Sequence, residues 1–408
     1  MKKAHKIILA AVLVLSLVAG CGIVFGKSSS PKEITFWHYF TSVNGETLQK
    51  FVDEYNKQQK EVHIKLEFLP RNELLKQLTI GLVSGQLPDM VFVDNPDHAS
   101  FSAMGLFADL TDRVNAWKDG KFLEGTINSA KYNGRIYGLP HASNTLALYY
   151  DKDMLKEAGV TPPTTWEELK TAAAKLTKGS RKGLAFSAIK SEEGTFQMLP
   201  FFLSAGANID NLNSPEGIKA LTFVTDLVNA GYVSKEVLNW VQSDVEKQFV
   251  SGNAAMIING PWIKPNLEKN APDKNWGVTK IPADKVYAST LGGENIAVIS
   301  KSKNIDECWD FLKWFLSKEN NIKFCKEVGR FSPRSDVTPE EVWAGDEIMQ
   351  VFADQMQYAQ PRGPHPKWPE ISDAIINAVQ ESITGVKKPA EALANAQAKI
   401  DAINASLK

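Results

Sequence analysis

The chain has 408 residues, more than one hydrophobic core usually serves, and 43% of them are apolar. We therefore expect two domains of roughly 150 to 200 residues each. The 46 basic side chains are balanced by 47 acidic ones and no stretch is rich in Lys and Arg, so the composition argues against a nucleic-acid partner.

The first twenty residues have the features of an export signal. Lys2, Lys3 and Lys6 supply positive charge, and the apolar run from Ile7 to Ala19 is too short for a comfortable membrane span. We expect residues 1–20 to be removed after export.

Cys21 follows the small residues Val18-Ala19-Gly20, and this arrangement resembles the processing box of bacterial lipoproteins, which more often has Leu where Val18 stands. Cys21 is then the lipidated N-terminus, and its several acyl chains would anchor the protein stably to the outer side of the cell membrane. Residues 21–31 form the anchor and a flexible tether. The alternative is an ordinary secretory signal followed by a chance cysteine.

The next segments alternate between strand and helix. Apolar alternation and helical stripes predict strands at residues 33–37, 62–68 and 89–94, and helices at residues 46–58 and 72–84. On the first helix, Leu48, Phe51, Val52 and Tyr55 form one apolar stripe. Repetition of this unit predicts an α/β domain with a mainly parallel sheet.

A second α/β set begins after residue 145. Thr165 and Glu168 have the spacing of a capping box, which predicts a helix that runs to Leu176. The other expected elements are strands at residues 184–186, 254–258 and 294–299, and helices at residues 195–204, 215–229, 243–251 and, with a break near Gly385 and Pro389, 371–407.

Cys308 and Cys325 lie in two amphipathic segments, residues 305–316 and 319–328. A disulfide is permitted outside the cytoplasm, but two buried thiols explain the pattern equally simply. No His or Cys spacing is typical of a metal site, so we expect neither a metal nor a cofactor.

Six short segments, taken in chain order, carry a likeness to a known family. They are Ile34-Thr35-Phe36-Trp37, Leu87-Pro88-Asp89-Met90-Val91-Phe92, Tyr137-Gly138-Leu139-Pro140, Leu148-Tyr149-Tyr150-Asp151-Lys152, Thr165-Trp166-Glu167-Glu168-Leu169 and Ala255-Met256-Ile257-Ile258-Asn259-Gly260-Pro261-Trp262. In this order they resemble the sugar-binding proteins of ATP-binding-cassette importers, the family that includes the maltose-binding protein. The likeness runs from about Glu33 to the C-terminus.

The resemblance implies a two-lobed periplasmic-binding-protein fold, with a hinge and a ligand cleft between the lobes. By position, the first lobe comprises residues 32–143 plus 292–338, and the second comprises residues 148–288 plus 345–408. The chain crosses the hinge at residues 144–147, 289–291 and 339–344. The resemblance also implies a monomer that captures an oligosaccharide and delivers it to the transmembrane permease subunits.

Sugar rings have apolar faces and polar edges, so a sugar site needs aromatic planes flanked by polar side chains. Such clusters follow two predicted strands, where ligands of open α/β sheets bind. The candidates are Trp37, His38 and Tyr39 after the first strand, and Asp94, Asn95 and Asp97 after the third.

Other candidates come from the resemblance or from loops. Trp262 matches a family tryptophan that stacks on sugar, and Phe196 matches a family aromatic position. Trp368 lies in a segment that we expect to be a loop because it is rich in proline. Further polar candidates are Asn144, Glu294, Asn295 and Arg362.

The chain departs from maltose-binding protein at Tyr39, Thr41, Ser42 and Asn144, so maltodextrin specificity is not implied. The same fold could bind a peptide, a polyol or a phosphorylated polyol, with Arg330, Arg334 and Arg362 as anion partners. A secreted glycoside hydrolase would need paired carboxylates, for which Asp94 and Asp97 are available. The binding protein, which is not an enzyme, is the favoured interpretation.

Overall fold

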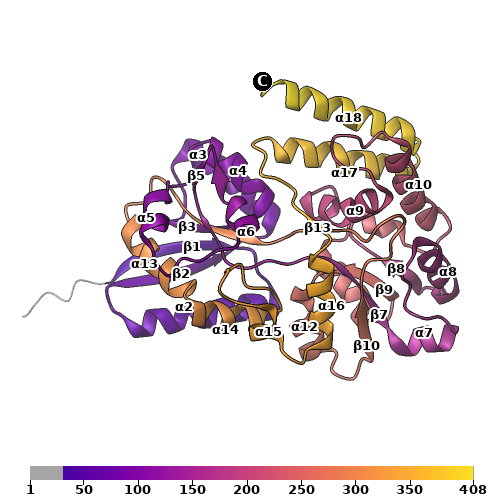
Figure 1. Ribbon diagram of the computed structural model, residues 1–408, viewed down its shortest axis with the longest axis horizontal. Helices are drawn as coiled ribbons and strands as arrows, with labels where there is room; N and C mark the ends of the chain where they lie inside the picture. Colours follow the sequence, from indigo (N-terminus) through magenta and orange to yellow (C-terminus); the bar gives the residue numbers. More distant parts are fainter. Residues whose placement is uncertain (1–30, 408) are drawn as a thin grey trace, which may run out of the picture.

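The structure is a computed structural model, and it describes residues 31–407. Two α/β lobes lie side by side, each built around its own sheet (Figure 1). The predicted signal and the predicted lipidation site at Cys21 fall outside the described residues. None of the helices between residues 31 and 407 combines the length and the apolar character that a membrane span requires.

The first lobe contains a five-stranded sheet in the order β2-β1-β3-β12-β6. Strand β1 pairs in parallel with β2 and β3, whereas β12 runs antiparallel to β3 and to β6. The bounds are β1 Lys32–His38, β2 Val62–Phe68, β3 Met90–Asp94, β6 Leu139–Pro140 and β12 Glu294–Val298.

Two helical layers cover this sheet. One face packs on helices α2, α13 and α14, and the predicted stripe of Leu48, Phe51, Val52 and Tyr55 on α2 is confirmed as buried. The other face packs on α3 and α4. The bounds are α2 Ser42–Gln58, α3 Arg71–Ser84, α4 Asn95–Ala103, α5 Thr111–Ala116, α6 Glu124–Asn128, α13 Ile305–Phe315 and α14 Lys318–Val328, with a small β4 Lys131–Tyr132 and β5 Arg135–Ile136 hairpin.

The second lobe contains a four-stranded sheet in the order β10-β7-β9-β8. Only the β8 and β9 pair is parallel, and β7 runs antiparallel to both β9 and β10. The bounds are β7 Ala147–Asp151, β8 Lys182–Ala185, β9 Ala254–Asn259 and β10 Trp276–Thr279.

Helices also cover both faces of the second sheet. The larger core involves α7, α8, α9, α10, α17 and α18, and the smaller one involves α11, α12 and α16. The bounds are α7 Lys152–Ala158, α8 Trp166–Leu176, α9 Glu192–Ala205, α10 Pro215–Asn229, α11 Gln242–Val250, α12 Lys264–Asn270, α15 Pro339–Trp343, α16 Glu347–Met356, α17 Trp368–Thr384 and α18 Pro389–Ala405, with 3-10 helices η1 Lys235–Leu238 and η2 Pro261–Ile263.

Two sequence predictions have clear outcomes here. The capping box of α8 is confirmed, since Thr165 Oγ1 accepts from the backbone N–H of Glu168, and the Glu168 side chain accepts from the Thr165 N–H. The three strands from which a mainly parallel first sheet was expected are parallel to one another, but β12 and β6 join that sheet antiparallel, so the whole sheet is mixed. The chain enters β7 from the first lobe and returns to the first lobe through β12, and both strands run against their neighbours.

The segments that join the lobes are hydrogen-bonded to one another. Ser143 and Phe331 exchange two backbone hydrogen bonds of 2.8 and 2.9 Å, and Asn144 and Gly292 exchange two of 3.1 and 2.8 Å. Beside them, β11 Ser289–Thr290 pairs in parallel with β13 Ala359–Gln360. The crossing stretches therefore lie side by side rather than as separate linkers.

Cys308 and Cys325 are both buried and both free thiols. The Cys308 thiol belongs to the main first-lobe core, whereas Cys325 packs in a different cluster with Ala142 and Val337. Burial raises the pKa of both thiols, that of Cys325 to about 12. Of the two possibilities left open by the sequence, the structure has the buried thiols.

Candidate ligand-binding cleft

A cavity of about 290 Å³ lies between the two lobes. Its wall comes from both lobes and from the segments that join them. The lining side chains include Tyr39, Phe40, Asn44, Phe68, Arg71, Asp94, Asn144, Glu192, Glu193, Phe196, Gln242, Glu246, Trp262, Asn266, Glu294, Arg330 and Arg362.

The first lobe contributes the carboxyl ends of its three parallel strands. Tyr39 follows β1, Phe68 ends β2, and Asp94 ends β3. Because parallel strands end at one edge of a sheet, these side chains converge there, as the general rule for open α/β sheets predicts. The second lobe contributes mainly the first turns of α9 and α11, together with Trp262 in η2.

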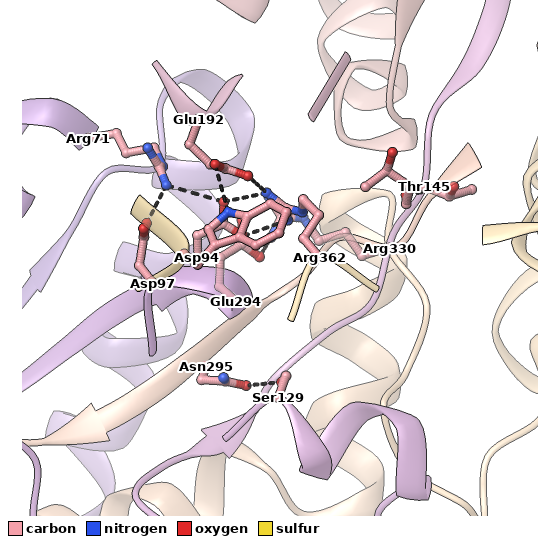
Figure 2. Close-up of polar contacts among 12 residues, drawn as sticks. Arg71, Asp94, Asp97, Ser129, Thr145, Glu192, Glu294, Asn295, Arg330 and Arg362 are labelled. Atoms are coloured by element: carbon pink, nitrogen blue, oxygen red, sulfur yellow. Dashed lines mark hydrogen bonds and ion pairs between the residues drawn. The ribbon is translucent and has the colours of Figure 1, made fainter. Parts of the chain in front are cut away.

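A network of ion pairs crosses the cleft (Figure 2). Arg362 binds Asp94 through two contacts of 2.9 and 3.1 Å, and its Nη1 lies 2.7 Å from Glu192 Oε1. Arg71 contacts both Asp94, at 3.3 Å, and Asp97. Since Asp94 belongs to the first lobe and Glu192 to the second, the Arg362 guanidinium bridges the two lobes.

Burial and charge act in opposite directions on these carboxyl groups. Burial opposes ionisation of Asp94, but Arg362 and Arg71 outweigh it and hold the pKa of Asp94 below its usual value. For Asp97, burial dominates and raises the pKa to about 7, although Arg71 counteracts part of the shift. Burial likewise raises the pKa of Glu294, which pairs with Arg330.

Aromatic rings line the cavity next to these charges. The rings of Phe196 and Trp262 lie 6.3 Å apart between centroids, tilted by 34°. The Arg362 guanidinium lies 4.3 Å from the centre of the Phe196 ring, and that of Arg330 lies 4.8 Å from the centre of Phe40. Phe68 is 51% exposed at the cavity wall, an unusual amount for a large apolar side chain.

Gly292 gives the wall its tight geometry at the joining segments. A Cβ atom there would lie 2.1 Å from Asn144 Oδ1 and 2.9 Å from Phe196 Cζ. Because Gly292 has no side chain, Asn144 of the joining segment and Phe196 of α9 can both pack against the Gly292 backbone.

Seven of the residues predicted from the sequence lie on the cavity wall. They are Tyr39, Asp94, Asn144, Phe196, Trp262, Glu294 and Arg362. They come from segments far apart in the chain, and the fold brings them to one place.

The other predicted residues lie away from the cavity wall. Trp37 donates its indole N–H to Glu67 at 2.9 Å and packs on the first-lobe core. His38 is buried, with Nδ1 accepting from the Phe40 N–H, and burial lowers its pKa to about 4. Asn95 is the first residue of α4, Asp97 is buried against Arg71, and Asn295 is buried beside Ser129 (Figure 2).

Trp368 requires a correction, because it does not lie in a loop. It is the first residue of α17, is 1% exposed, and donates its indole N–H to Glu192 Oε2 at 2.9 Å. The proline that follows it occupies the first turn, where the missing N–H costs no helical hydrogen bond. Trp368 thus lies outside the cavity wall, and its hydrogen bond positions the wall residue Glu192.

Several wall residues were not predicted. Phe68 ends β2 and Arg71 lies just after it, so the strand-end rule that we applied to the first and third strands would have found them had it been applied to the second. Glu192 is the first residue of α9 and Glu246 lies in the middle of α11, and no local pattern distinguishes them from solvent-exposed acidic residues. Their place in the cleft depends on the packing of the lobes.

The arrangement favours binding through hydrogen bonds and flat apolar contacts. The buried polar atoms without a partner in the described part of the chain include four on cavity residues, namely Asn44 Oδ1, Gln242 Nε2, Arg330 Nε and Arg362 Nε. Buried polar atoms are normally paired, so these four are available to a ligand. Between residues 31 and 407, no group of three or more His, Cys, Asp and Glu side chains is arranged to hold a metal ion.

The chain resembles known binding proteins over nearly its whole length. It is 26% identical to the arabinooligosaccharide-binding protein of Bacillus subtilis (strain 168), with 85% of this chain and 83% of the relative covered. It is 27% identical to the galactooligosaccharide-binding protein of the same organism, with 96% and 95% covered.

A solved structure shares the fold. The solute-binding protein of an ABC transporter from Thermotoga lettingae, solved with alpha-D-tagatose, superposes with a TM-score of 0.86 at 27% identity, over 91% of this chain and 99% of that one. The family model for bacterial extracellular solute-binding proteins matches residues 50–351, which is most of the chain. With two lobes around one cavity and this match, the chain belongs to the family of bacterial extracellular solute-binding proteins.

Proposed function

We propose that this protein captures an oligosaccharide in the cleft between its lobes and delivers it, chemically unchanged, to the permease subunits of an ATP-binding-cassette importer. The observation that carries the proposal is the composition of the cavity wall. Aromatic faces from both lobes, such as Phe68 and Trp262, stand beside unpaired hydrogen-bonding atoms of Asn44, Gln242 and Arg330. A sugar ring needs this combination of flat apolar surface and polar edge.

The relatives support a sugar over other solutes. Two of them bind arabinooligosaccharides and galactooligosaccharides by name, and the Thermotoga lettingae structure contains a monosaccharide. Because the identities are below 30%, the individual sugar does not transfer to this chain. We infer a short oligosaccharide of a few units, which suits a cavity of about 290 Å³.

Binding would close the lobes about the segments at residues 144–147, 289–291 and 339–344. We infer that residues 32–143 with 292–338 move against residues 148–288 with 345–408. A ligand can shift such an equilibrium only by contacting both lobes at once, and the mixed wall of the cavity supplies those contacts.

The protein would act as a monomer on the outer face of the bacterial cell membrane. We propose that the lipid is attached to Cys21, after which residues 21–31 give the folded body freedom to reach the permease.

An anionic ligand such as a phosphorylated polyol is the weaker alternative. Arg330 and Arg362, the two cleft arginines that such a ligand would need, are already paired with Glu294, Asp94 and Glu192. Arg334 is buried away from the cavity and paired with Asp336. A peptide is disfavoured for the same reason, because its carboxylate would meet arginines that are already paired.

A glycoside hydrolase is also less well supported than a sugar-binding protein. A hydrolase needs two carboxyl groups on either side of the scissile bond. Asp94 and Asp97 instead contact the same guanidinium, that of Arg71, and Asp97 does not line the cavity. The two groups are therefore held together by a cation rather than arranged around a substrate.

The test combines a thermal-shift screen with product analysis. A panel of neutral and modified sugars, polyols, phosphorylated polyols and peptides is added to the pure protein, and a true ligand raises the midpoint of unfolding because it binds only the native state. The best ligand is then incubated in labelled form and recovered. A midpoint raised by no sugar, or cleavage of the recovered sugar, would overturn the proposal.

A further inference from the structure

The cleft wall carries more negative than positive side chains. Each of its three arginines already contacts a carboxylate, so the charge of each guanidinium is compensated within the wall. The carboxylates on the wall are Asp94, Glu192, Glu193, Glu246 and Glu294. Glu193 and Glu246 are left over, since neither forms an ion pair with any side chain between residues 31 and 407. An uncompensated carboxylate in a closed cleft is costly unless a ligand supplies the positive charge.

Glu246 is the better placed of the two to receive a ligand. It lies half-buried on α11, and only its Oε2 accepts a hydrogen bond, from Asn266 Nδ2 at 3.3 Å. Burial raises the pKa of Glu246 to about 7, while Asn266 and Lys247 act in the opposite direction. Lys247 itself is turned to solvent and bound to Asp244 at 2.9 Å, so it does not neutralise the cleft.

A second acceptor lies at the same corner of the cavity, on the other lobe. Asn44 of α2 is 6% exposed, and its Nδ2 donates to the backbone oxygen of Trp262 at 3.1 Å. Its Oδ1 is buried without a donor from the described residues. The neighbouring Val43 N–H donates to Asn266 Oδ1 at 3.3 Å, which connects Asn44 to the residue that holds Glu246.

The corner formed by Asn44, Glu246 and Asn266 therefore offers acceptors from both lobes. The N-terminal turn of α2 lies at this corner, where the Val43 N–H donates to Asn266, but no donor of the described chain reaches Asn44 Oδ1. A hydroxyl group donates one hydrogen bond and leaves the charge uncompensated, whereas an ammonium group donates three and accepts none. Charge-assisted bonds of this kind are about twice as strong as neutral ones.

We propose that the ligand carries a basic amine, and that this amine sits between Glu246 of the second lobe and Asn44 of the first. The substrate class is an amino sugar with a free amine, as a single unit or within a short oligosaccharide. This inference rests on the proposed function as a sugar-binding protein. Glu246 is then the specificity-determining residue, and the amine bonds across the lobes in the closed form.

The experiment compares matched sugars that differ in one substituent. Calorimetry at pH 7.5 measures the affinity of the amine, N-acetyl and hydroxyl forms of gluco, galacto and manno sugars, as monosaccharides and as disaccharides. We expect the tightest ligand of the panel to be an amine form, at least about tenfold tighter than its hydroxyl and N-acetyl counterparts, as one charge-assisted contact implies.

The variant Glu246→Gln keeps the shape and the hydrogen bond from Asn266 but removes the charge. Its affinity for the amine form of the sugar should fall about tenfold or more, whereas its affinity for the hydroxyl form should change by less than about threefold. Glu167→Gln is the matched control, because Glu167 is exposed on α8 and forms no hydrogen bond or ion pair with the residues described. The control should leave both affinities unchanged.

The outcomes separate this inference from the proposed function. If a hydroxyl or N-acetyl sugar, or any neutral oligosaccharide, binds more tightly than every amine form, the protein is still a sugar-binding protein but the inference is wrong. Equal losses for amine and hydroxyl forms in Glu246→Gln would also overturn it. If no sugar of any kind binds, the proposed function itself fails.

Discussion

Arg362 donates to Asp94 through both Nη atoms of its guanidinium, at 3.1 and 2.9 Å. This pair links the segment before α17 to the end of β3 on the opposite lobe. The same guanidinium contacts Glu192 of α9. Bidentate ion pairs between an arginine and a carboxylate combine charge with a defined geometry, so they fix the distance between the two elements that they connect. The two lobes are thus connected by an ion-pair network as well as by the joining segments.

Removal of this connection should open the protein without ligand. We expect Arg362→Met to have a larger radius of gyration than the wild type by small-angle scattering, and Arg362→Lys to fall between them because an ammonium group cannot bind two carboxylates as a fork. Lys219→Met is the control, since its ion pair with Asp284, at 2.6 Å, lies within the second lobe. An identical radius for all four proteins would show that the ion pair does not hold the lobes.

Trp262 is the aromatic residue whose replacement should most directly weaken sugar binding. Trp262→Ala removes a ring beside Phe196 and should reduce the free energy of binding by about 1 to 3 kcal/mol, the range of an aromatic hot spot. Calorimetry measures the affinity, and denaturant titration measures the stability. Trp37→Phe, which lies away from the cavity, should leave the affinity unchanged. A loss of about 3 to 5 kcal/mol of stability with normal affinity would instead identify Trp262 as a core residue.

Gly292 is predicted to tolerate no side chain. In Gly292→Ala the new Cβ would collide with Asn144 and Phe196, so both must move and the cavity wall is displaced. Ligand affinity should fall about tenfold or more, because positioning errors of this kind remove several contacts at once. Gly125→Ala is the control, since a Cβ there meets nothing within 4 Å. Equal affinities of the two variants would contradict the prediction.

Buried histidines should make the protein sensitive to acid. Burial lowers the pKa of His98 and of His141 to about 3, and that of His38 to about 4, against about 6.5 in an unfolded chain. Between about pH 6.5 and pH 4 the unfolded chain binds more protons, so the stability present above pH 6.5 is lost as the pH falls.

His98 offers the cleanest test of this dependence because neither of its ring nitrogens has a partner among the described residues. His98→Leu should reduce the slope of unfolding free energy against pH by up to about 1.4 kcal/mol per pH unit, measured by urea titration between pH 4.5 and pH 6.5. His63→Leu is the control, because His63 is exposed and solvent reaches its ring in both the folded and the unfolded protein. Parallel slopes for wild type and His98→Leu would refute the assignment.

The lipid anchor is tested by fractionation. Cys21→Ala should move the protein from the membrane fraction to the soluble extracytoplasmic fraction, because the remaining chain has no acyl group to hold it. Wild type and Cys308→Ala, a cysteine buried in the fold, should both stay with the membrane. Membrane retention of Cys21→Ala would leave the anchor without support.

The sequence predicted local structure better than it predicted the cleft. The α8 capping box depends on residues three apart, so Thr165 and Glu168 suffice to place the helix start. The partner of Asp94 across the sheet is Glu294, which lies two hundred residues later, and no local pattern connects them. The antiparallel direction of β12 follows from the path between the lobes, which a pass along the chain does not reveal.

The wall residues show the same limit. Tyr39 and Asp94 were predictable because they follow strands, and Trp262 because of the family likeness. Glu246 looks like any acidic residue of an amphipathic helix, and only the approach of α2 and Asn266 makes it part of a cavity. The prolines around Trp368 led to the prediction of a loop, but a proline in the first turn is compatible with a helix.

The position of β12 in the first sheet has a consequence for the order in which the chain can fold. The four strands of the second sheet span residues 147–279, so they are all present before the first sheet is complete. The first sheet begins at residue 32 but has an open edge at β3 until residues 294–298 arrive. A chain that emerges N-terminus first would thus finish its later sheet earlier. Until then the apolar run from Met90 to Val93 pairs with β1 on one side and has an open edge on the other, and an open apolar edge favours aggregation.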